Sequence, residues 1–329
     1  MDKSDEYLYR PQEYTQSANS LFHFMKERDF LLNSLKKKAL FPRYCEEQID
    51  YLNLKNPGMN FSRIAVLEKC FCDISLHNIG KNFNSEINAD SLKNWDEKIK
   101  NKIPKRGSHT DFYGKYGIAF SKGWGEKKGI QPVWYINEKG EVSQALKKIW
   151  QTMMDVEALS DVLVDDMLYR LAYVKPLKGE MSRKIPIFDE NDKTLINVTY
   201  EKNFHDEQEW RYVPNKENLK MAQLECIIAK EQMMEASASG PSHIDSINFN
   251  IEKDEKYRCL WLEYSYNEIK YLVVPNSTER LNLINAIMEM PDENFDLVQD
   301  QRDEKDKIII QKLLLASKIL VLNEIERDA

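Results

Sequence analysis

Hydrophobic residues recur with helical spacing in some segments of this chain and with strand spacing in others, in no regular order. The clearest helical pattern covers residues 143–174, where apolar side chains recur three or four positions apart. This spacing predicts core packing by one long helix, or by two helices with a break near Val156. Similar but shorter patterns predict further helices at residues 29–41, 216–236, 277–290 and 303–316.

Short runs rich in β-branched and aromatic residues predict strands between these helices. They occur at residues 118–121, 132–136, 195–200, 207–213, 259–264 and 269–274, and residues 64–74 read as a helix end or a strand. We therefore expect an α+β fold with a mixed, mostly antiparallel sheet and several packed helices. The expected organisation is a polar extension at 1–18, a core at 19–214 and a C-terminal α/β portion at 215–329 packed on it.

Composition narrows the class of protein. The 329 residues carry a net charge of −7, so the overall field does not favour nucleic acid, although the basic run Lys98–Arg106 departs from the average. No stretch approaches the roughly 20 apolar residues that a membrane span requires, and the N-terminus is polar. We expect a soluble cytoplasmic protein without a membrane partner.

Cysteine spacing gives little support for a metal site. Cys70 and Cys72 would share one face of a strand, but no second cysteine or histidine pair stands at ligand spacing to complete a zinc site. The pattern favours small buried residues, and we expect no metal. His109 and His205 lie in polar segments that predict surface positions.

The most informative stretch is Glu207-Gln208-Glu209-Trp210-Arg211, which reads as a strand. Side chains alternate along a strand, so Glu207, Glu209 and Arg211 would share a face. Such a face is either reactive or a network of charge pairs. Two other kinds of chemistry are disfavoured, because the chain lacks both a Gly-x-Ser-x-Gly elbow and a phosphate-binding Gly-x-x-x-x-Gly-Lys-Ser/Thr loop.

Several segments together resemble the AbiGi family of bacterial abortive-infection proteins. They are spread over nearly the whole chain: Leu21-Phe22-His23-Phe24, Phe41-Pro42-Arg43-Tyr44, Cys70-Phe71-Cys72-Asp73-Ile74, Tyr113–Ile118, Ser121–Gly125, Pro132–Ile136, Glu207–Pro214, Ile269–Val274 and Ser317-Lys318-Ile319. The resemblance implies a role in phage defence, as the antitoxin-like half of a two-gene system. It also implies a toxin or effector partner encoded nearby.

The order of parts, from His23 to the late Glu-x-Glu, also resembles ADP-ribosyltransferase folds. That resemblance implies nicotinamide dinucleotide (NAD) as a substrate, with Glu209 stabilising the positive charge that develops as nicotinamide leaves and Glu207 orienting the acceptor. It further implies a set of dinucleotide-binding residues, in which His23 or Arg43 holds phosphate or ribose and aromatic rings provide stacking surfaces: His23, Arg43, Tyr113, Tyr116, Ser121 and Trp124.

Two functions remain open from the sequence. The first is a phage-defence enzyme that transfers or hydrolyses ADP-ribose, with Glu209 as the essential residue. The second is a non-catalytic antitoxin or scaffold that binds a toxin partner, in which case patches on the C-terminal helices would matter and Glu209 would only hold its strand. A homo-oligomer is compatible with either.

Overall fold

The main sheet is built around one long strand, β6. The computed structural model describes residues 18–56, 59–60, 62–83, 85–155, 161–189, 192–229, 243–295 and 303–328. The nine-stranded main sheet has the order β18-β17-β8-β1-β6-β14-β9, and β3 and β15 also pair with β6. Pairing is antiparallel except between β17 and β18, which confirms the α+β class.

The described strands are β1 Ser20–Met25, β2 Ala39–Leu40, β3 Arg43–Gln48, β4 Lys55–Asn56, β5 Met59–Asn60, β6 Arg63–Cys72, β7 Ser85–Ile87, β8 Tyr116–Ser121, β9 Gln131–Pro132, β10 Trp134–Ile136, β11 Val174–Pro176, β12 Lys178–Asp189, β13 Asp192–Asn203, β14 Glu209–Tyr212, β15 Ile227–Ala229, β16 Leu262–Glu263, β17 Ile269–Val274 and β18 Ile319–Val321. The described α-helices are α1 Arg28–Lys37, α2 Glu97–Lys100, α3 His109–Tyr113, α4 Lys122–Lys127, α5 Glu141–Met154, α6 Asp161–Leu171, α7 Lys216–Ala222, α9 His243–Lys253, α10 Ser277–Met288, α11 Glu304–Ala316 and α12 Leu322–Asp328. Short 3-10 helices include η5 Phe204–Glu207 and η6 Glu255–Leu260.

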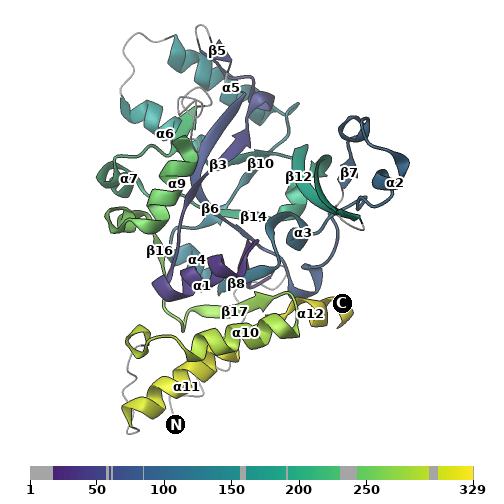
Figure 1. Cartoon of the computed structure of the whole chain (residues 1–329). Helices are drawn as coiled ribbons and strands as arrows, with labels where there is room; N and C mark the ends of the chain where they lie inside the picture. Colours follow the sequence, from purple (N-terminus) through teal and green to yellow (C-terminus); the bar gives the residue numbers. More distant parts are fainter. Residues whose placement is uncertain are drawn as a thin grey trace.

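Two large apolar clusters pack around the sheet. One joins α1, α10 and α11 to β8 and β17, with Leu35, Phe120 and Leu272 among its fully buried members. The other joins α5, α6 and α9 to the first half of β6. Figure 1 shows α10 and α11 below β17, at the opposite end of the molecule from α5. Strands β15, β17 and β18, from the C-terminal third, belong to the main sheet.

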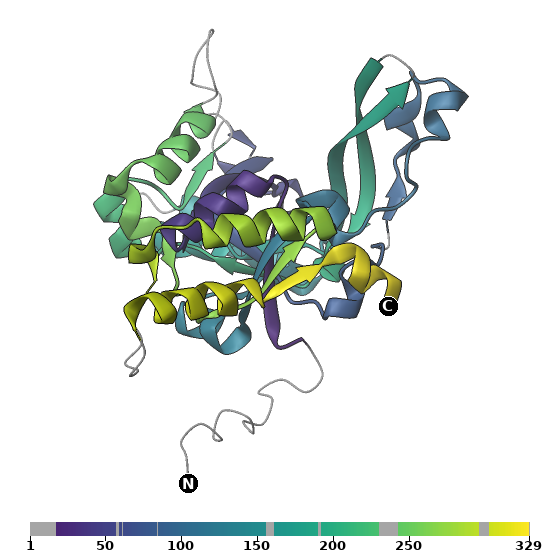
Figure 2. The same ribbon diagram turned by 60° about the horizontal axis from the view of Figure 1, so that its bottom comes forward.

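A hairpin arm projects from this body. Strands β12 and β13 pair over twelve positions, from Lys178↔Asn203 to Asp189↔Asp192, and β7 adds to β13. The arm has its own apolar cluster, which includes Phe83, Phe112 and Tyr200. Figure 2 shows the hairpin standing away from the main sheet.

The sheet opens between β1 and β3. Both strands lie along the same edge of β6. In a strand the carbonyls of residues an even number of positions apart point to the same edge. The Ser62 carbonyl accepts from the backbone of Ile49, next to β3, and the Cys70 carbonyl accepts from the His23 ring of β1. Pairing with β3 ends at Glu68, and the pairing of β1 with β6 is confined to Cys72. The His23 ring therefore contacts β6 where neither strand continues the ladder.

Several predicted elements are confirmed. Helices α1, α10 and α11 occupy the predicted segments, and α5 and α6 realise the two-helix alternative, with Val156 outside the described residues. Residues 64–74 resolve as a strand, β6, and β8 and β17 match their predicted strands. The predicted polar extension lies outside the described residues up to position 17.

Other predictions are wrong for identifiable reasons. The helix predicted over 216–236 ends at Ala222, because Gln223 adopts φ 55° and Ile227 and Ile228 form β15 on the edge of β6; residues 230–242 lie outside the described part. The glycine-rich turn after Ser121 is helix α4, whose first turn is capped by the Ser121 hydroxyl. Residues 259–264 are mostly 3-10 helix and loop, with only the two-residue β16.

Candidate functional site

Glu207 and Glu209 come from different elements. Glu209 and Arg211 lie in β14, but Glu207 ends the 3-10 helix η5, so the prediction of one strand through both carboxylates is wrong at Glu207. Gln208 between them has φ 45°, a left-handed conformation that turns the chain into β14. The predicted common face is still formed, because Glu207, Glu209 and Arg211 are all buried while Gln208 is exposed.

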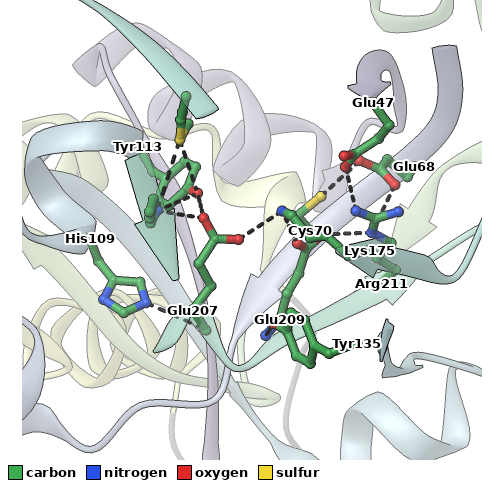
Figure 3. A network of polar contacts seen from close by, with 12 residues as sticks. Glu47, Glu68, Cys70, His109, Tyr113, Tyr135, Lys175, Glu207, Glu209 and Arg211 are labelled. Atoms are coloured by element: carbon green, nitrogen blue, oxygen red, sulfur yellow. Dashed lines mark hydrogen bonds and ion pairs between the residues drawn. The ribbon is translucent and has the colours of Figure 1, made fainter. Parts of the chain in front are cut away.

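Lys175 of β11 joins the two carboxylates (Figure 3). Its Nζ lies 2.7 Å from Glu207 Oε2 and 2.5 Å from Glu209 Oε2. Burial alone would lower the pKa of this ammonium group, but the two carboxylates raise it well above its usual value. Lys175 is therefore charged, and it bridges β14 to the start of the hairpin arm.

The second oxygen of Glu207 faces the arm. Glu207 Oε1 accepts from the Tyr113 hydroxyl and from Lys202 Nζ, the latter at 2.5 Å. Lys202 is fully buried in a cage of aromatic rings, with its Nζ 3.7 Å from the centre of Phe83 and 4.5 Å from that of Phe112. One carboxylate thus ties η5, α3 and β13 together.

Arg211 occupies the other end of the network. Its Nε lies 2.6 Å from Glu209 Oε1 and 3.0 Å from Glu68 Oε2, while Nη1 donates to the Ala172 carbonyl at 2.8 Å. Nη2 pairs with Glu47 of β3. The guanidinium has no solvent exposure, so it acts as the central cation of this part of the sheet.

The network balances its charge through Glu68. It contains four carboxylates, at Glu47, Glu68, Glu207 and Glu209, and three cations, at Lys175, Lys202 and Arg211. Burial raises the pKa of Glu68 to about 8, whereas the neighbouring cations lower the pKa of Glu209 and of Glu207. With Glu68 protonated at neutral pH, three negative charges meet three positive charges.

A cavity of about 400 Å³ lies beside this network, at the opening between β1 and β3. Five of the residues predicted for a site line it: His23, Arg43, Tyr113, Glu207 and Glu209. The His23 ring donates from Nδ1 to the Cys70 carbonyl at 2.8 Å, and burial lowers its pKa well below the usual value. A volume of this size falls within the range of about 300–1,000 Å³ typical of small-molecule sites.

The structure places the other three predicted residues elsewhere. Tyr116 donates to Glu279 Oε2 at 3.0 Å, and the Ser121 hydroxyl caps α4 by accepting from the backbone of Trp124 at 3.1 Å. Trp124 stacks on Phe120 with 3.9 Å between ring centres, inside the first apolar cluster. None of the three lines the cavity.

Several residues of the site had no recognisable signal in the sequence. Lys175 and Lys202 lie outside any motif, and Glu68 lies in an apolar run of β6 where a carboxylate could have drawn attention as a charge in a buried strand. The surface position predicted for His109 is wrong: its side chain is buried beside Phe83, and Nε2 contacts the Glu207 carbonyl at 3.3 Å. His205 is exposed, as predicted.

Glu68, Cys70 and Glu209 offer three ligand atoms within 4.8 Å of one another. Such a set could hold a cation on spacing alone. However, the Arg211 guanidinium already lies between the two carboxylates. The Cys70 thiol donates to Glu68 Oε1 at 3.2 Å, and burial raises its pKa well above the usual value, so it is protonated. The arrangement favours a guanidinium over a metal at this point.

Comparison with known proteins identifies the family. Residues 103–275 match the model of the family described as "Putative abortive phage resistance protein AbiGi, antitoxin", which is more than half of the chain. The chain belongs to the AbiGi family. Over 300 residues it is also 28% identical to the abortive phage resistance protein AbiGi of Lactococcus lactis subsp. cremoris, covering 88% of this chain and 99% of that relative.

The AbiGi match includes most of the charge network. Lys175, Lys202, Glu207, Glu209 and Arg211 all lie within residues 103–275, whereas β1, β3 and β6 precede that range. No solved structure matches the chain. No helix in the described ranges is both long and apolar enough to cross a membrane.

Proposed function

We propose that this AbiGi protein is the antitoxin-type component of an abortive phage resistance system and acts by binding a toxin or effector partner. The description of the matching family carries the proposal. It reverses the order of the two functions considered from the sequence, where an enzyme came first. The resemblance to AbiGi proteins thus guides the function more closely than the Glu-x-Glu motif does.

The state of the two carboxylates supports a non-catalytic role. Glu209 pairs through Oε1 with Arg211 and through Oε2 with Lys175, and both oxygens of Glu207 also accept from protein donors. A carboxylate that stabilises a developing positive charge acts best when that charge is its main partner. Here the protein's own cations already fill that position.

The C-terminal helices offer a surface for the partner. On α11, Ile309 and Leu313 are exposed and lie four residues apart on one face, with Leu314 beside them, while Lys312 points inward and donates to the Met290 carbonyl at 2.7 Å. On the neighbouring α10, Leu281 and Met288 are also exposed. The exposed apolar side chains of these two helices suit a partner protein with an apolar face.

The test is co-expression of the full chain with the product of its neighbouring gene. We expect the neighbour alone to stop growth and the pair to restore it. Leu313→Asp should abolish rescue and co-purification, because it places a charge in the interface. Leu163→Asp on α6 is the matched control, since Leu163 and Leu313 are 55% and 54% exposed. A harmless neighbour, or a chain toxic by itself, would overturn the proposal.

A second candidate function rests on the convergence of predicted residues. His23, Arg43, Tyr113 and the Glu207–Glu209 pair come from distant parts of the sequence, yet all five residues line one cavity. This favours ADP-ribosyltransferase-like chemistry on NAD as the alternative. Incubation of the purified chain with labelled NAD, with and without its neighbour and phage lysate, tests it. Loss of NAD or labelling of a protein, abolished by Glu209→Gln in a folded variant, would establish the enzyme.

A further inference from the structure

Two cations of the cavity take no part in the charge network. Lys69 Nζ has no carboxylate oxygen within 4.0 Å and no hydrogen-bond acceptor in the described part of the chain. Arg43 is half-exposed, and its guanidinium lies 3.8 Å from Glu252 Oε2, a carboxylate that does not line the cavity. Lys69 and Arg43 therefore retain donors that the protein does not use.

The carboxylates around the cavity do not neutralise these cations. Each of them accepts from a donor other than Lys69 and Arg43; Arg63, for example, pairs with Glu46, and Asn88 donates to Glu180. These carboxylates are Glu46, Glu47, Glu68, Glu180, Glu207 and Glu209. In the described part of the chain none of these six carboxylates forms an ion pair with Lys69 or Arg43, and the nearby Glu252, which pairs with Arg43 and favours the charged form of Lys69, lies outside the cavity lining.

Geometry brings the two cations together at the opening of the sheet. Arg43 begins β3 opposite Glu68 of β6, and Lys69 is the next residue of β6, where the ladder with β3 ends. His23, Arg43 and Lys69 all line the cavity. Burial and, to a smaller extent, the Lys69 charge lower the pKa of His23, and burial and the Arg43 charge lower the pKa of Lys69 to about 8. Burial is the larger cause in both cases, so an anion bound there would be poorly screened by water.

The remaining walls of the cavity are largely aromatic. Phe71 packs edge-on against the His23 ring at 5.8 Å between centres, and Phe24 lies on the neighbouring strand. Tyr113 and Phe204 close the side toward the hairpin arm. Such walls accept a flat ring.

We infer that this cavity binds a phosphate-bearing molecule with a flat ring, of the size of a mononucleotide, whose phosphate contacts Arg43 and Lys69. Arginine and lysine together offer up to eight N–H donors to phosphate oxygens. The ring would lie between the aromatic walls, next to the acceptors of the charge network. It deepens the NAD alternative proposed above, because it places a nucleotide phosphate in the same cavity and on Arg43, but the binding itself requires neither the toxin partner nor any reaction.

Isothermal titration of the purified full-length protein with AMP, GMP, CMP and UMP tests the inference. At least one mononucleotide should bind, and its nucleoside, which lacks the phosphate, should bind at least tenfold more weakly. Inorganic phosphate should compete weakly. Absence of binding by all four mononucleotides, or equal affinity for nucleoside and nucleotide, would overturn the inference.

Two pairs of variants locate the phosphate. Arg43→Met should weaken mononucleotide binding at least tenfold, while Arg28→Met, equally half-exposed and paired with a glutamate outside the cavity, should leave it within twofold. Lys69→Met should weaken binding similarly, with Lys270→Met as control because Lys270 is a partly buried strand lysine remote from the cavity. Because Arg43 is half-exposed, Arg43→Met should fold even if Lys69→Met does not, and the test then rests on Arg43→Met. Unchanged affinity in Arg43→Met would place the phosphate elsewhere and contradict the assignment.

Discussion

Glu207 and Glu209 converge on a single ammonium group, that of Lys175, although they belong to different secondary-structure elements. The left-handed residue between them makes this possible by turning η5 into β14. Because Lys175 also precedes the hairpin arm, one buried cation links the main sheet to the arm. The primary role of the two carboxylates is therefore structural, because through Lys175 they hold the main sheet and the hairpin arm together, and we refer to this contact as the joint.

Loss of that cation should destabilise the fold. In Lys175→Met two buried carboxylates lose a shared partner, and breaking a buried pair in this way costs about 3–5 kcal/mol. Urea unfolding at pH 7 measures the loss. Lys127→Met, at the exposed end of α4, should change stability by less than about 0.5 kcal/mol. Equal stability of the two variants would show that Lys175 does not hold the joint.

The pH dependence of stability should report on Glu68. The folded-state pKa of about 8 exceeds the unfolded value of 4.5, so the folded state holds the extra proton between these values. The contribution of Glu68 is therefore most favourable at low pH and is lost as pH rises toward and through 8. The contribution of His109 to stability changes with pH in the opposite direction, because burial lowers its pKa to about 4. Measurements on the wild type alone would therefore mix the two effects.

Glu68→Gln isolates this contribution. The amide cannot ionise, so the variant should gain stability relative to wild type as pH rises from 5 to 8.5, by at least about 1 kcal/mol. Glu46→Gln, on the exposed side of β3, should show no such trend. A constant difference between Glu68→Gln and wild type across this range would contradict the raised pKa.

Gly114 should tolerate no side chain. It follows Tyr113 directly, has φ +118°, and a Cβ there would lie 2.0 Å from the Met25 carbonyl oxygen. Gly114→Ala should therefore cost more than about 3 kcal/mol and disturb the Tyr113 contact with Glu207. Gly129 also has a positive φ, of +75°, but open space around its Cβ position, so Gly129→Ala should cost only about 1 kcal/mol. Thermal melts of both variants show whether the close approach to the Met25 carbonyl at Gly114 destabilises the protein beyond the cost of the positive φ that the two glycines share.

The sequence predicted the parts of the fold whose patterns are local. Helices α10 and α11 follow from apolar periods that their own residues carry. Ile227 and Ile228 fit a helical period equally well, and only the free edge of β6 made them a strand. The arm was largely missed because β12 contains Pro186 and many polar residues, and its long pairing with β13 is set by the hairpin as a whole.

The candidate site was predicted in part for the same reason. Alternation within a strand anticipated that Glu209 and Arg211 share a face. Partners supplied by other strands could not be anticipated, because a lone lysine such as Lys175 carries no local sign of burial. Trp124, chosen for its aromatic ring, is core packing on Phe120. An aromatic residue near a glycine therefore marked a core position as often as a cavity position.

Glu209→Gln should reduce stability, and this separates a structural role from a catalytic one. The amide keeps the size of the side chain but removes a charge from between Arg211 and Lys175, at a cost of about 3 kcal/mol for a buried pair left incomplete. Phage protection should then fall in proportion to the loss of folded protein, and it should return at lower temperature. Normal unfolding together with complete loss of protection would instead assign Glu209 to chemistry. Glu263→Gln, an exposed strand glutamate paired with Arg258 at 2.7 Å, should leave both stability and protection unchanged.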